Sequence, residues 1–266
     1  MKLNHARIVL TGASGGIGQA IAKELVKRGA HLLLVDLDSE KLLTLQNTLK
    51  ASNAQVYALS ADLSSHDSYE QITNYAIQQM GHIDILINGA GIMSYTEFHQ
   101  QDAAMVERAF KINVIAPMQL ARLCLPDMLA KQQGQIVNIG SIFGSIGFAY
   151  FSSYSATKFA LRGFTESLRR ELADTGVQLT YVAPRAVKTP LNSPAVYTMA
   201  QKVNMNMDPP EWVADKIVKA IEANKKDVYL GFPESLFVRI NAIFPRLVDF
   251  ALRKQNRIMH ECLDQQ

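Results

Sequence analysis

The chain has 266 residues, with 27 Lys and Arg against 24 Asp and Glu, so its net charge is +3 when histidine is neutral. A charge this small excludes nucleic acid as a main ligand, because binding to phosphates depends on an excess of cations. Hydrophobic residues make up 48% and charged residues 19% of the chain, which excludes a disordered, fibrous or coiled-coil protein. The low charge predicts extra apolar surface somewhere in the fold.

Short aliphatic runs alternate with longer helical patterns along the whole chain. The runs predict buried strands at 8–10, 32–35, 56–59, 83–87, 136–139, 177–182 and 228–230. Helices are expected between them, at 16–29, 38–50, 66–80, 100–131, 152–174 and 209–223. This alternation predicts an α/β fold: a Rossmann-type, doubly wound parallel sheet of seven strands with helices on both faces.

Two segments interrupt the alternation. Residues 186–210 contain four prolines and are expected to form an irregular lid over a substrate. Residues 233–266 are expected to add amphipathic helices, broken at Pro245, to the domain that residues 1–232 form. Because no linker or composition shift divides the chain, we expect a single domain.

The cysteines, the histidines and the N-terminal segment bear on the compartment of the protein and on metal binding. Two cysteines, Cys124 and Cys262, give no disulfide framework, so a reducing, cytoplasmic compartment is expected. The histidines are scattered and lack partners at metal-ligand spacing, so no metal site is expected. The polar N-terminus predicts no signal peptide. We also find no run of about 18 apolar residues that predicts a membrane span.

The first strand leads directly into the turn Thr11-Gly-Ala-Ser-Gly-Gly-Ile-Gly18 and then into a helix. Glycines at 12, 16 and 18 let the backbone approach a pyrophosphate, and the helix N-terminus presents free N–H groups to it. The alternative, a flexible glycine-rich turn, is disfavoured by the strand–turn–helix context.

Asp36 ends the second strand, about 20 residues after the glycine turn, where a carboxylate can bind the adenosine ribose hydroxyls and repel a 2′-phosphate. We therefore favour NAD(H) as cofactor without excluding NADP(H). The alternative role for Asp36 is a helix N-cap, which suits Asp38 or Ser39 better.

Several motifs, in order along nearly the whole chain, resemble those of the short-chain dehydrogenase/reductase family. The glycine turn resembles TGxxxGxG, Asn88-Gly-Ala-Gly91 resembles NNAG, Tyr154-Ser-Ala-Thr-Lys158 matches YxxxK, and residues 184–189 resemble PGxxxT. The resemblance implies a catalytic set of Asn113, Ser141, Tyr154 and Lys158. Together with the turn, it implies cofactor contacts at Gly12, Ser14, Gly16, Ile17, Gly18, Asp36, Asp62, Leu63, Asn88, Ala90, Gly91, Tyr154, Lys158, Pro184, Val187 and Thr189.

Two residues depart from the family pattern. Gly89 replaces the second Asn of NNAG, so a hydrogen-bonding side chain is lost and we expect a looser centre of the sheet. Arg185 replaces the glycine of PG and is expected to place a cation near the cofactor or the mouth of the active site. A contact between Arg185 and a cofactor phosphate would weaken the preference for NAD(H).

The spacing of Tyr154 and Lys158 places both on one face of a helix, one turn apart. A nearby ammonium favours the phenolate, so the pKa of Tyr154 is expected to fall. Ser141, just after a strand, can hydrogen-bond to a carbonyl oxygen. The resemblance implies that Asn113 binds a water connecting Lys158 to solvent. Without the other motifs, the spacing of Tyr154 and Lys158 would indicate only an ordinary solvent-exposed face of a helix. A serine hydrolase is disfavoured because Ser141 lacks a G-x-S-x-G turn.

Apolar residues surround the catalytic set and predict a bulky apolar carbonyl or alcohol substrate, such as a sterol-like, retinoid-like or long-chain compound. Expected substrate contacts are Ser141, Phe143, Phe148, Tyr154 and Tyr197. Two alternatives remain open: an NADPH-dependent 3-oxoacyl-thioester reductase and a catalytically silent dinucleotide-binding regulator. The resemblance also implies a homodimer or homotetramer.

The C-terminal segment is basic as well as apolar. Arg239, Arg246 and Arg253 recur every seven residues, and between residues 235 and 260 five cations face one acid, Asp249. Amphipathic helices of this kind either lie on an anionic membrane surface or pack on their own domain or a partner subunit. Packing is the favoured interpretation, and peripheral membrane contact through 233–260 is the alternative.

Overall fold

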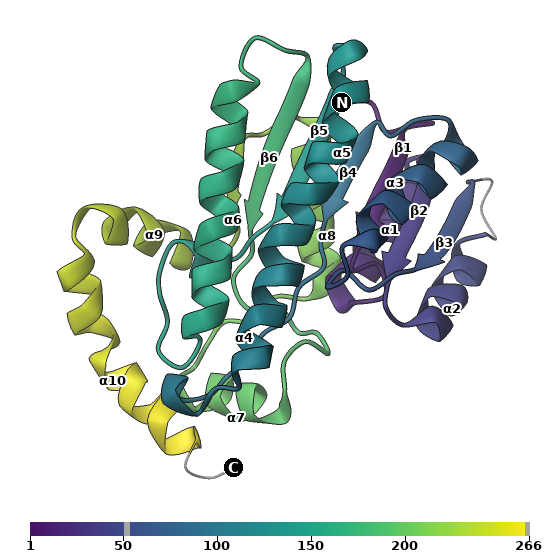
Figure 1. The fold of residues 1–266 in the computed structure, drawn as a ribbon. Helices are drawn as coiled ribbons and strands as arrows, with labels where there is room; N and C mark the ends of the chain where they lie inside the picture. The colour runs from purple at the N-terminus through teal and green to yellow at the C-terminus, as the bar shows by residue number, and fades with distance from the viewer. Residues whose placement is uncertain (51–53, 264–266) are drawn as a thin grey trace.

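The computed structural model describes residues 1–50 and 54–263, and its centre is one parallel sheet (Figure 1). Within these residues the strand order is β3-β2-β1-β4-β5-β6-β7, and every pair is parallel. The predicted seven-stranded, doubly wound sheet is therefore confirmed. The strands are β1 (Arg7–Thr11), β2 (His31–Asp36), β3 (Val56–Ser60), β4 (Ile85–Asn88), β5 (Gly134–Ile139), β6 (Val177–Ala183) and β7 (Asp227–Tyr229).

Helices cover both faces of the sheet because each strand is apolar on both of its sides. In β1, Ile8 and Leu10 point into one core and Val9 into the other, and all three are fully buried. The first core includes α1 (Gly16–Lys27), α2 (Ser39–Leu49) and α8 (Pro210–Glu222). The second core includes α3 (Asp67–Met80), α5 (Ala116–Ala130) and α6 (Ser152–Glu171).

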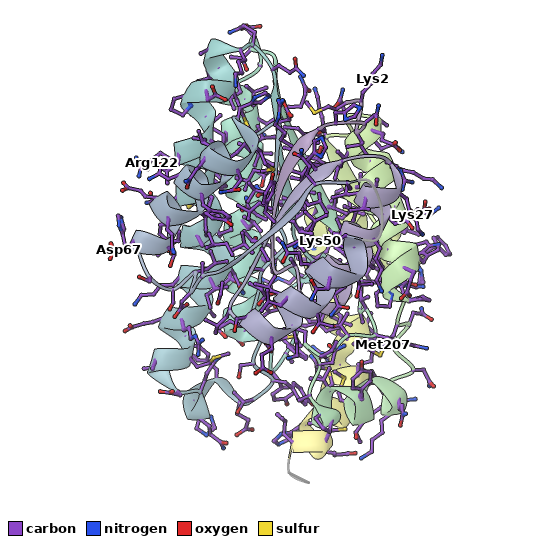
Figure 2. The ribbon with its side chains drawn as sticks, turned by 90° about the vertical axis from the view of Figure 1, so that its right-hand side faces the viewer. Lys2, Lys27, Lys50, Asp67, Arg122 and Met207 are labelled. Carbon is purple, nitrogen blue, oxygen red and sulfur yellow. The ribbon has the colours of Figure 1, made fainter. Side chains whose placement is uncertain are left out.

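Parallel strands bring all the segments that follow them to one edge of the sheet. Lys2, just before β1, and Met207, in the segment before α8, lie at opposite ends of the molecule (Figure 2). Residues 186–210 thus lie at the carboxyl edge, where ligands of open α/β sheets bind. The strand order reverses between β1 and β4, which places the crevice for such a ligand beside the glycine turn.

The long helix expected at 100–131 is interrupted in the structure. It consists of a short 3₁₀ turn, η1 (Phe98–Gln100), then α4 (Ala103–Phe110), a π-helical turn, η2 (Lys111–Ile115), and α5. Asn113 lies in the π turn and is fully buried. Such wide turns re-aim one side chain and are frequent at functional sites, but apolar periodicity does not reveal them.

The expectation of an irregular segment over 186–210 is wrong for part of its length. Residues Pro194–Lys202 form α7, which begins with Ser193 as N-cap accepting a hydrogen bond from the Val196 N–H. Pro194 occupies the first helical position, where its missing N–H costs nothing. Pro194, one of the four prolines that made this segment look irregular, is therefore the first residue of a helix.

The C-terminal segment forms two helices, as predicted: α9 (Glu234–Ile243) and α10 (Pro245–Leu263), with the break at Phe244 and Pro245. Residues 264–266 of the predicted extension lie outside the described residues. No helix in the described part of the chain is long and apolar enough to cross a bilayer.

We predict opposite effects of alanine at two glycines. A Cβ on Gly18 would overlap the carbonyl oxygen of Gly12, because α1 packs against the turn at that point, whereas a Cβ on Gly163 in α6 meets no atom within 4 Å. We expect Gly18→Ala to lower the free energy of unfolding by about 2 kcal/mol or more. The control, Gly163→Ala, should raise it by about 0.5–1 kcal/mol. Urea unfolding measures both, and equal stabilities would contradict the close approach.

Candidate active site

A cavity of about 660 Å³ lies at the carboxyl ends of β1, β2, β3 and β4. Its volume is within the range of small-molecule sites. The structure brings eleven of the expected cofactor residues together around it: Gly12, Ser14, Gly16, Ile17, Gly18, Asp36, Asp62, Leu63, Ala90, Gly91 and Thr189. Its shape follows the crevice between the glycine turn and the β4 exit.

The chemistry of the cavity fits a dinucleotide. Gly15 is the N-cap of α1, and no side chain caps the first turn, so backbone N–H groups and the positive end of the helix dipole are available to a pyrophosphate. Gly12 adopts φ +70°, and a Cβ on it would lie 2.7 Å from the Ala90 backbone. The glycines therefore bring two chain segments close together as well as leaving room for a ligand.

Backbone N–H groups of neighbouring residues hold the Asp36 carboxylate at the edge of the cavity. One carboxylate oxygen accepts a hydrogen bond from the Ser14 N–H at 2.9 Å, and the other accepts one from the Leu37 N–H at 2.8 Å. Asp38, not Asp36, caps α2 through the Lys41 N–H, as the sequence indicated. Asp36 is therefore free of a capping role and faces the cavity with its charge.

Two cations that the sequence did not single out also line the cavity. Lys41 pairs with Asp38 at 2.7 Å, and the positive charge of Arg108 on α4 contributes to a lowered pKa of Asp62. Hydrogen bonds from Ser64 are the larger cause of that shift. Lys41 could have been found from its place in the first turn after Asp36. No local pattern in the sequence points to Arg108, because only the fold brings it near Asp62, 46 residues earlier in the chain.

Both departures from the family pattern have a structural explanation. A Cβ on Gly89 would lie 2.8 Å from the Thr11 carbonyl oxygen, so the glycine permits close contact with β1. Asn88 does not line the cavity; its side chain donates to Asn138 in β5. Arg185 turns away from the cavity and pairs with Asp208 at 2.7 Å and Glu234 at 3.0 Å. It therefore gives no support to a phosphate of the cofactor.

The expected catalytic residues lie together beside Gly91. Lys158 Nζ lies 5.6 Å from the centre of the Tyr154 ring and donates to the Ile139 carbonyl at 3.0 Å. A Cβ built on Gly91 would lie 3.3 Å from Asn113 Oδ1 and 3.6 Å from Lys158 Nζ. Because Gly91 also lines the cavity, it connects the catalytic group with the dinucleotide crevice.

Asn113 is held by three hydrogen bonds. Its Oδ1 accepts from the Ile92 N–H at 2.9 Å, and its Nδ2 donates to the Ile92 carbonyl at 2.9 Å and to Thr157 Oγ1 at 3.0 Å. The π turn is thus tied to the segment after β4 and to the helix that carries Tyr154 and Lys158. Such a fully bonded amide positions its neighbours firmly.

Burial dominates the electrostatics of the Tyr154–Lys158 pair. It raises the pKa of Tyr154 to about 12, although hydrogen bonding to Ser141 acts in the opposite direction. It lowers the pKa of Lys158 to about 8. The expected fall in the pKa of Tyr154 is therefore wrong for the protein alone, because loss of solvent outweighs the nearby amine. Near neutral pH the phenol keeps its proton.

The expected substrate contacts are only partly brought together. Phe143 stacks on Phe148 with ring centres 4.4 Å apart and lies 6.1 Å from the Tyr154 ring. Tyr197 lines neither this aromatic group nor the 660 Å³ cavity. Its hydroxyl donates a hydrogen bond to the Thr189 carbonyl at 3.0 Å. Of the other expected cofactor contacts, Pro184 and Val187 do not line the 660 Å³ cavity.

A second cavity, of about 550 Å³, begins at the same aromatic pair. Phe143 and Phe148 line it together with residues of the lid segment and of the two C-terminal helices. Most of its other lining residues are apolar: Ile142, Ile146, Ala186, Val203, Met205, Pro233, Phe237, Ile240, Leu247, Val248, Ala251 and Leu252. The charged residues Arg185, Glu234 and Lys254 also line it, so the cation of Arg185 lies at this cavity and not at the cofactor crevice. This apolar cavity therefore lies between Phe143, which contacts Tyr154, and the helices α9 and α10.

The fold agrees with comparisons to known proteins. A family model described as short chain dehydrogenase matches residues 6–200. The ketoacyl reductase HetN of Nostoc is 34% identical over 93% of this chain and 88% of its own length. The bovine dehydrogenase/reductase SDR family member 7B is 30% identical over 97% of this chain and 85% of its own length.

A solved structure shows the same architecture. The short-chain dehydrogenase/reductase from Burkholderia phymatum, crystallised in complex with NAD, superimposes with a TM-score of 0.85. It covers 93% of this chain and 96% of its own at 23% identity, which bears on the fold alone. The chain belongs to the short-chain dehydrogenase/reductase family. It is accordingly an NAD(P)-dependent oxidoreductase.

We predict that Lys158→Met stabilises the protein below about pH 8. The folded-state pKa of Lys158 is about 8 against an ordinary 10.5, so keeping its ammonium buried costs stability at neutral pH. Between these two values the unfolded state binds more protons, so wild-type stability rises with pH and the advantage of the variant shrinks. Unfolding midpoints from pH 6 to about 10.5 measure this difference. A constant difference over that range would contradict the shifted pKa.

Proposed function

We propose that this protein transfers a hydride between NAD(H) and an apolar carbonyl or alcohol, with Tyr154 as acid and base. The observation that supports this most is the position of the Tyr154–Lys158 pair between two sets of cavity residues. Lys158 Nζ lies beside Gly91, which lines the dinucleotide crevice, and the Tyr154 ring lies 6.1 Å from that of Phe143, which lines the apolar cavity. When bound, a nicotinamide cofactor supplies or accepts the hydride.

In the direction of reduction, Ser141 and Tyr154 act on the carbonyl oxygen. The neutral phenol of Tyr154 is the proton-donor form, and it gives its proton to the oxygen as negative charge develops there. The Ser141 hydroxyl hydrogen-bonds to the same oxygen and stabilises that charge. Lys158, when protonated, favours the phenolate that remains, and Asn113 holds the segment after β4 in place beside it.

The preference for NAD(H) rests on the charge of Asp36. Two backbone hydrogen bonds orient its carboxylate, which repels a 2′-phosphate and accepts hydrogen bonds from ribose hydroxyls. The lysine that lines the same region, Lys41, is neutralised by Asp38, and Arg185 points elsewhere. Three acids, Asp36, Asp38 and Asp62, and two cations, Lys41 and Arg108, line the crevice, so the acids outnumber the cations there.

We expect Asp36→Asn to change the cofactor preference mainly through charge, since the side chains have the same shape and the amide loses only one of the two backbone hydrogen bonds that the carboxylate accepts. Removing the repulsion should tighten NADPH binding by about tenfold, while NADH binding weakens severalfold because asparagine accepts fewer hydrogen bonds. Fluorescence titrations with both dinucleotides measure this. The control is Asp67→Asn, on α3 outside the crevice, which should change neither constant. Unchanged NADPH affinity in Asp36→Asn would contradict the assignment.

We expect Tyr154→Phe to lower kcat by about 100-fold or more, because it removes the transferred proton and little volume. The dissociation constant for NADH should change less than about twofold, since the phenol does not line the crevice. Steady-state kinetics and fluorescence titration separate the two quantities. Wild-type turnover in this variant would overturn the mechanism.

The apolar lining of the second cavity favours a bulky apolar substrate, sterol-like, retinoid-like or long-chain. In a series of methyl ketones of growing chain length, each buried CH₂ should raise kcat/KM by about two- to fourfold until the cavity is full. A preference for small polar alcohols would contradict this substrate class.

A 3-oxoacyl-thioester reductase is the second candidate, favoured by the 34% identity to a ketoacyl reductase and opposed by Asp36. A 3-oxoacyl thioester assayed with NADPH tests it in the same panel. A catalytically silent regulator is disfavoured, because Asn113, Tyr154 and Lys158 are all present and lie together. Tight cofactor binding with no turnover of any substrate would favour it instead.

A further inference from the structure

The surface of the two C-terminal helices is unusually apolar for exposed residues. Sixteen large hydrophobic side chains are exposed in the described residues, and seven of them lie between residues 232 and 250: Phe232, Leu236, Phe237, Ile243, Phe244, Leu247 and Phe250. Phe250 is 67% exposed and Ile243 69%. A group of exposed apolar side chains in one segment marks an interaction site more often than single exposed residues do. We call these seven residues the apolar patch.

The other face of α9 and α10 is already occupied. Val238 and Val248 are buried against Ile142, Ile146 and Tyr181. Farther along α10, Met259 is fully buried and its carbonyl accepts a hydrogen bond from Tyr95. The helices are therefore anchored to the body of the protein, and the apolar patch is their outer face. Figure 1 shows them projecting beyond β6, on the side away from β3.

Cations accompany the apolar patch. Arg239, Arg246, Arg253 and Arg257 are all exposed, and none of them forms an ion pair with another described residue. Arg253 lies over the Phe250 ring at 5.3 Å, so cation and apolar side chain share one surface. The acid at the start of α9, Glu234, is already paired with Arg185.

We propose that the α9–α10 surface docks this enzyme onto an anionic lipid bilayer. Aromatic and aliphatic side chains would enter the interface between headgroups and acyl chains, while the arginines pair with anionic headgroups. A second copy of this chain fits less well. Around a twofold axis the patch would meet itself, and the arginines of the two copies would face each other.

The docking surface also borders the apolar cavity. Phe237 and Leu247 are exposed members of the patch and also line the 550 Å³ cavity. Docked in this orientation, the cavity faces the bilayer, and an apolar substrate passes into it without crossing water. This second step rests on the proposed function, whereas the docking itself does not.

Co-sedimentation of the full chain with vesicles tests the docking. Vesicles of phosphatidylcholine containing phosphatidylglycerol should bind about tenfold or more tightly than phosphatidylcholine alone, and added salt should reduce the difference. Phe244→Ser with Phe250→Ser should weaken binding to both by about tenfold or more. Arg246→Gln with Arg253→Gln should weaken binding to anionic vesicles by about 30-fold and leave binding to neutral ones unchanged.

Matched controls remove the same chemistry elsewhere on the surface. Leu43→Ser with Ile77→Ser removes two exposed apolar side chains from α2 and α3, and Lys23→Gln with Lys50→Gln removes two cations. Both controls should bind like the wild type. Equal losses in variants and controls would overturn the docking. So would absence of vesicle binding together with a dimer, seen by light scattering, that Phe244→Ser with Phe250→Ser breaks.

Activity separates this inference from the proposed function. Phe244 and Phe250 do not line either cavity, so their variant should reduce a short, water-soluble ketone at the wild-type rate. With a long-chain ketone dissolved in anionic vesicles, the kcat/KM of this double variant should fall by the same factor as its binding to the vesicles. Turnover without vesicle binding overturns the docking alone. Vesicle binding without turnover of any carbonyl overturns the proposed function and leaves the docking intact.

Discussion

The site depends on one constraint: a parallel sheet whose strands are buried on both faces delivers every following segment to the same edge. Ile8, Val9 and Leu10 have no exposed surface, so β1 cannot bind a ligand along its length. Function is confined to the segments beyond the strand ends. The reversal of strand order between β1 and β4 then separates the loops at one point, and the 660 Å³ crevice lies there.

Close packing around this crevice allows few substitutions at the glycines that border it. Gly18 lets α1 pack against the Gly12 carbonyl, and Gly89 lets the β4 exit pack against Thr11. The same contacts direct the start of α1 at the crevice. Stability and cofactor binding therefore depend on the same backbone atoms, and a substitution there affects both.

Burial of Lys158 is the main electrostatic cost of the site. The lysine donates to the Ile139 carbonyl but has no carboxylate partner among the described residues, and its pKa falls to about 8. A protein can keep such a group when its chemistry requires it, at the expense of stability. The C-terminal helices involve a comparable compromise, since their inner face packs on the domain while their outer face leaves large hydrophobic side chains in water.

The sequence by itself determined the fold class and the seven strands, because apolar periodicity is a local signal. The glycine turn and Asp36 predicted one part of the crevice lining, and resemblance to family motifs predicted the other part, including Asp62, Gly91 and Thr189. The sequence also placed both C-terminal helices and their break near Pro245. Only the tertiary structure decided what depends on distant segments. It put Arg108 beside Asp62, turned Arg185 towards Asp208 and raised the pKa of Tyr154 by burial. The π turn at Asn113 and the helix that begins at Pro194 belong to the same group, because packing against other elements selects them.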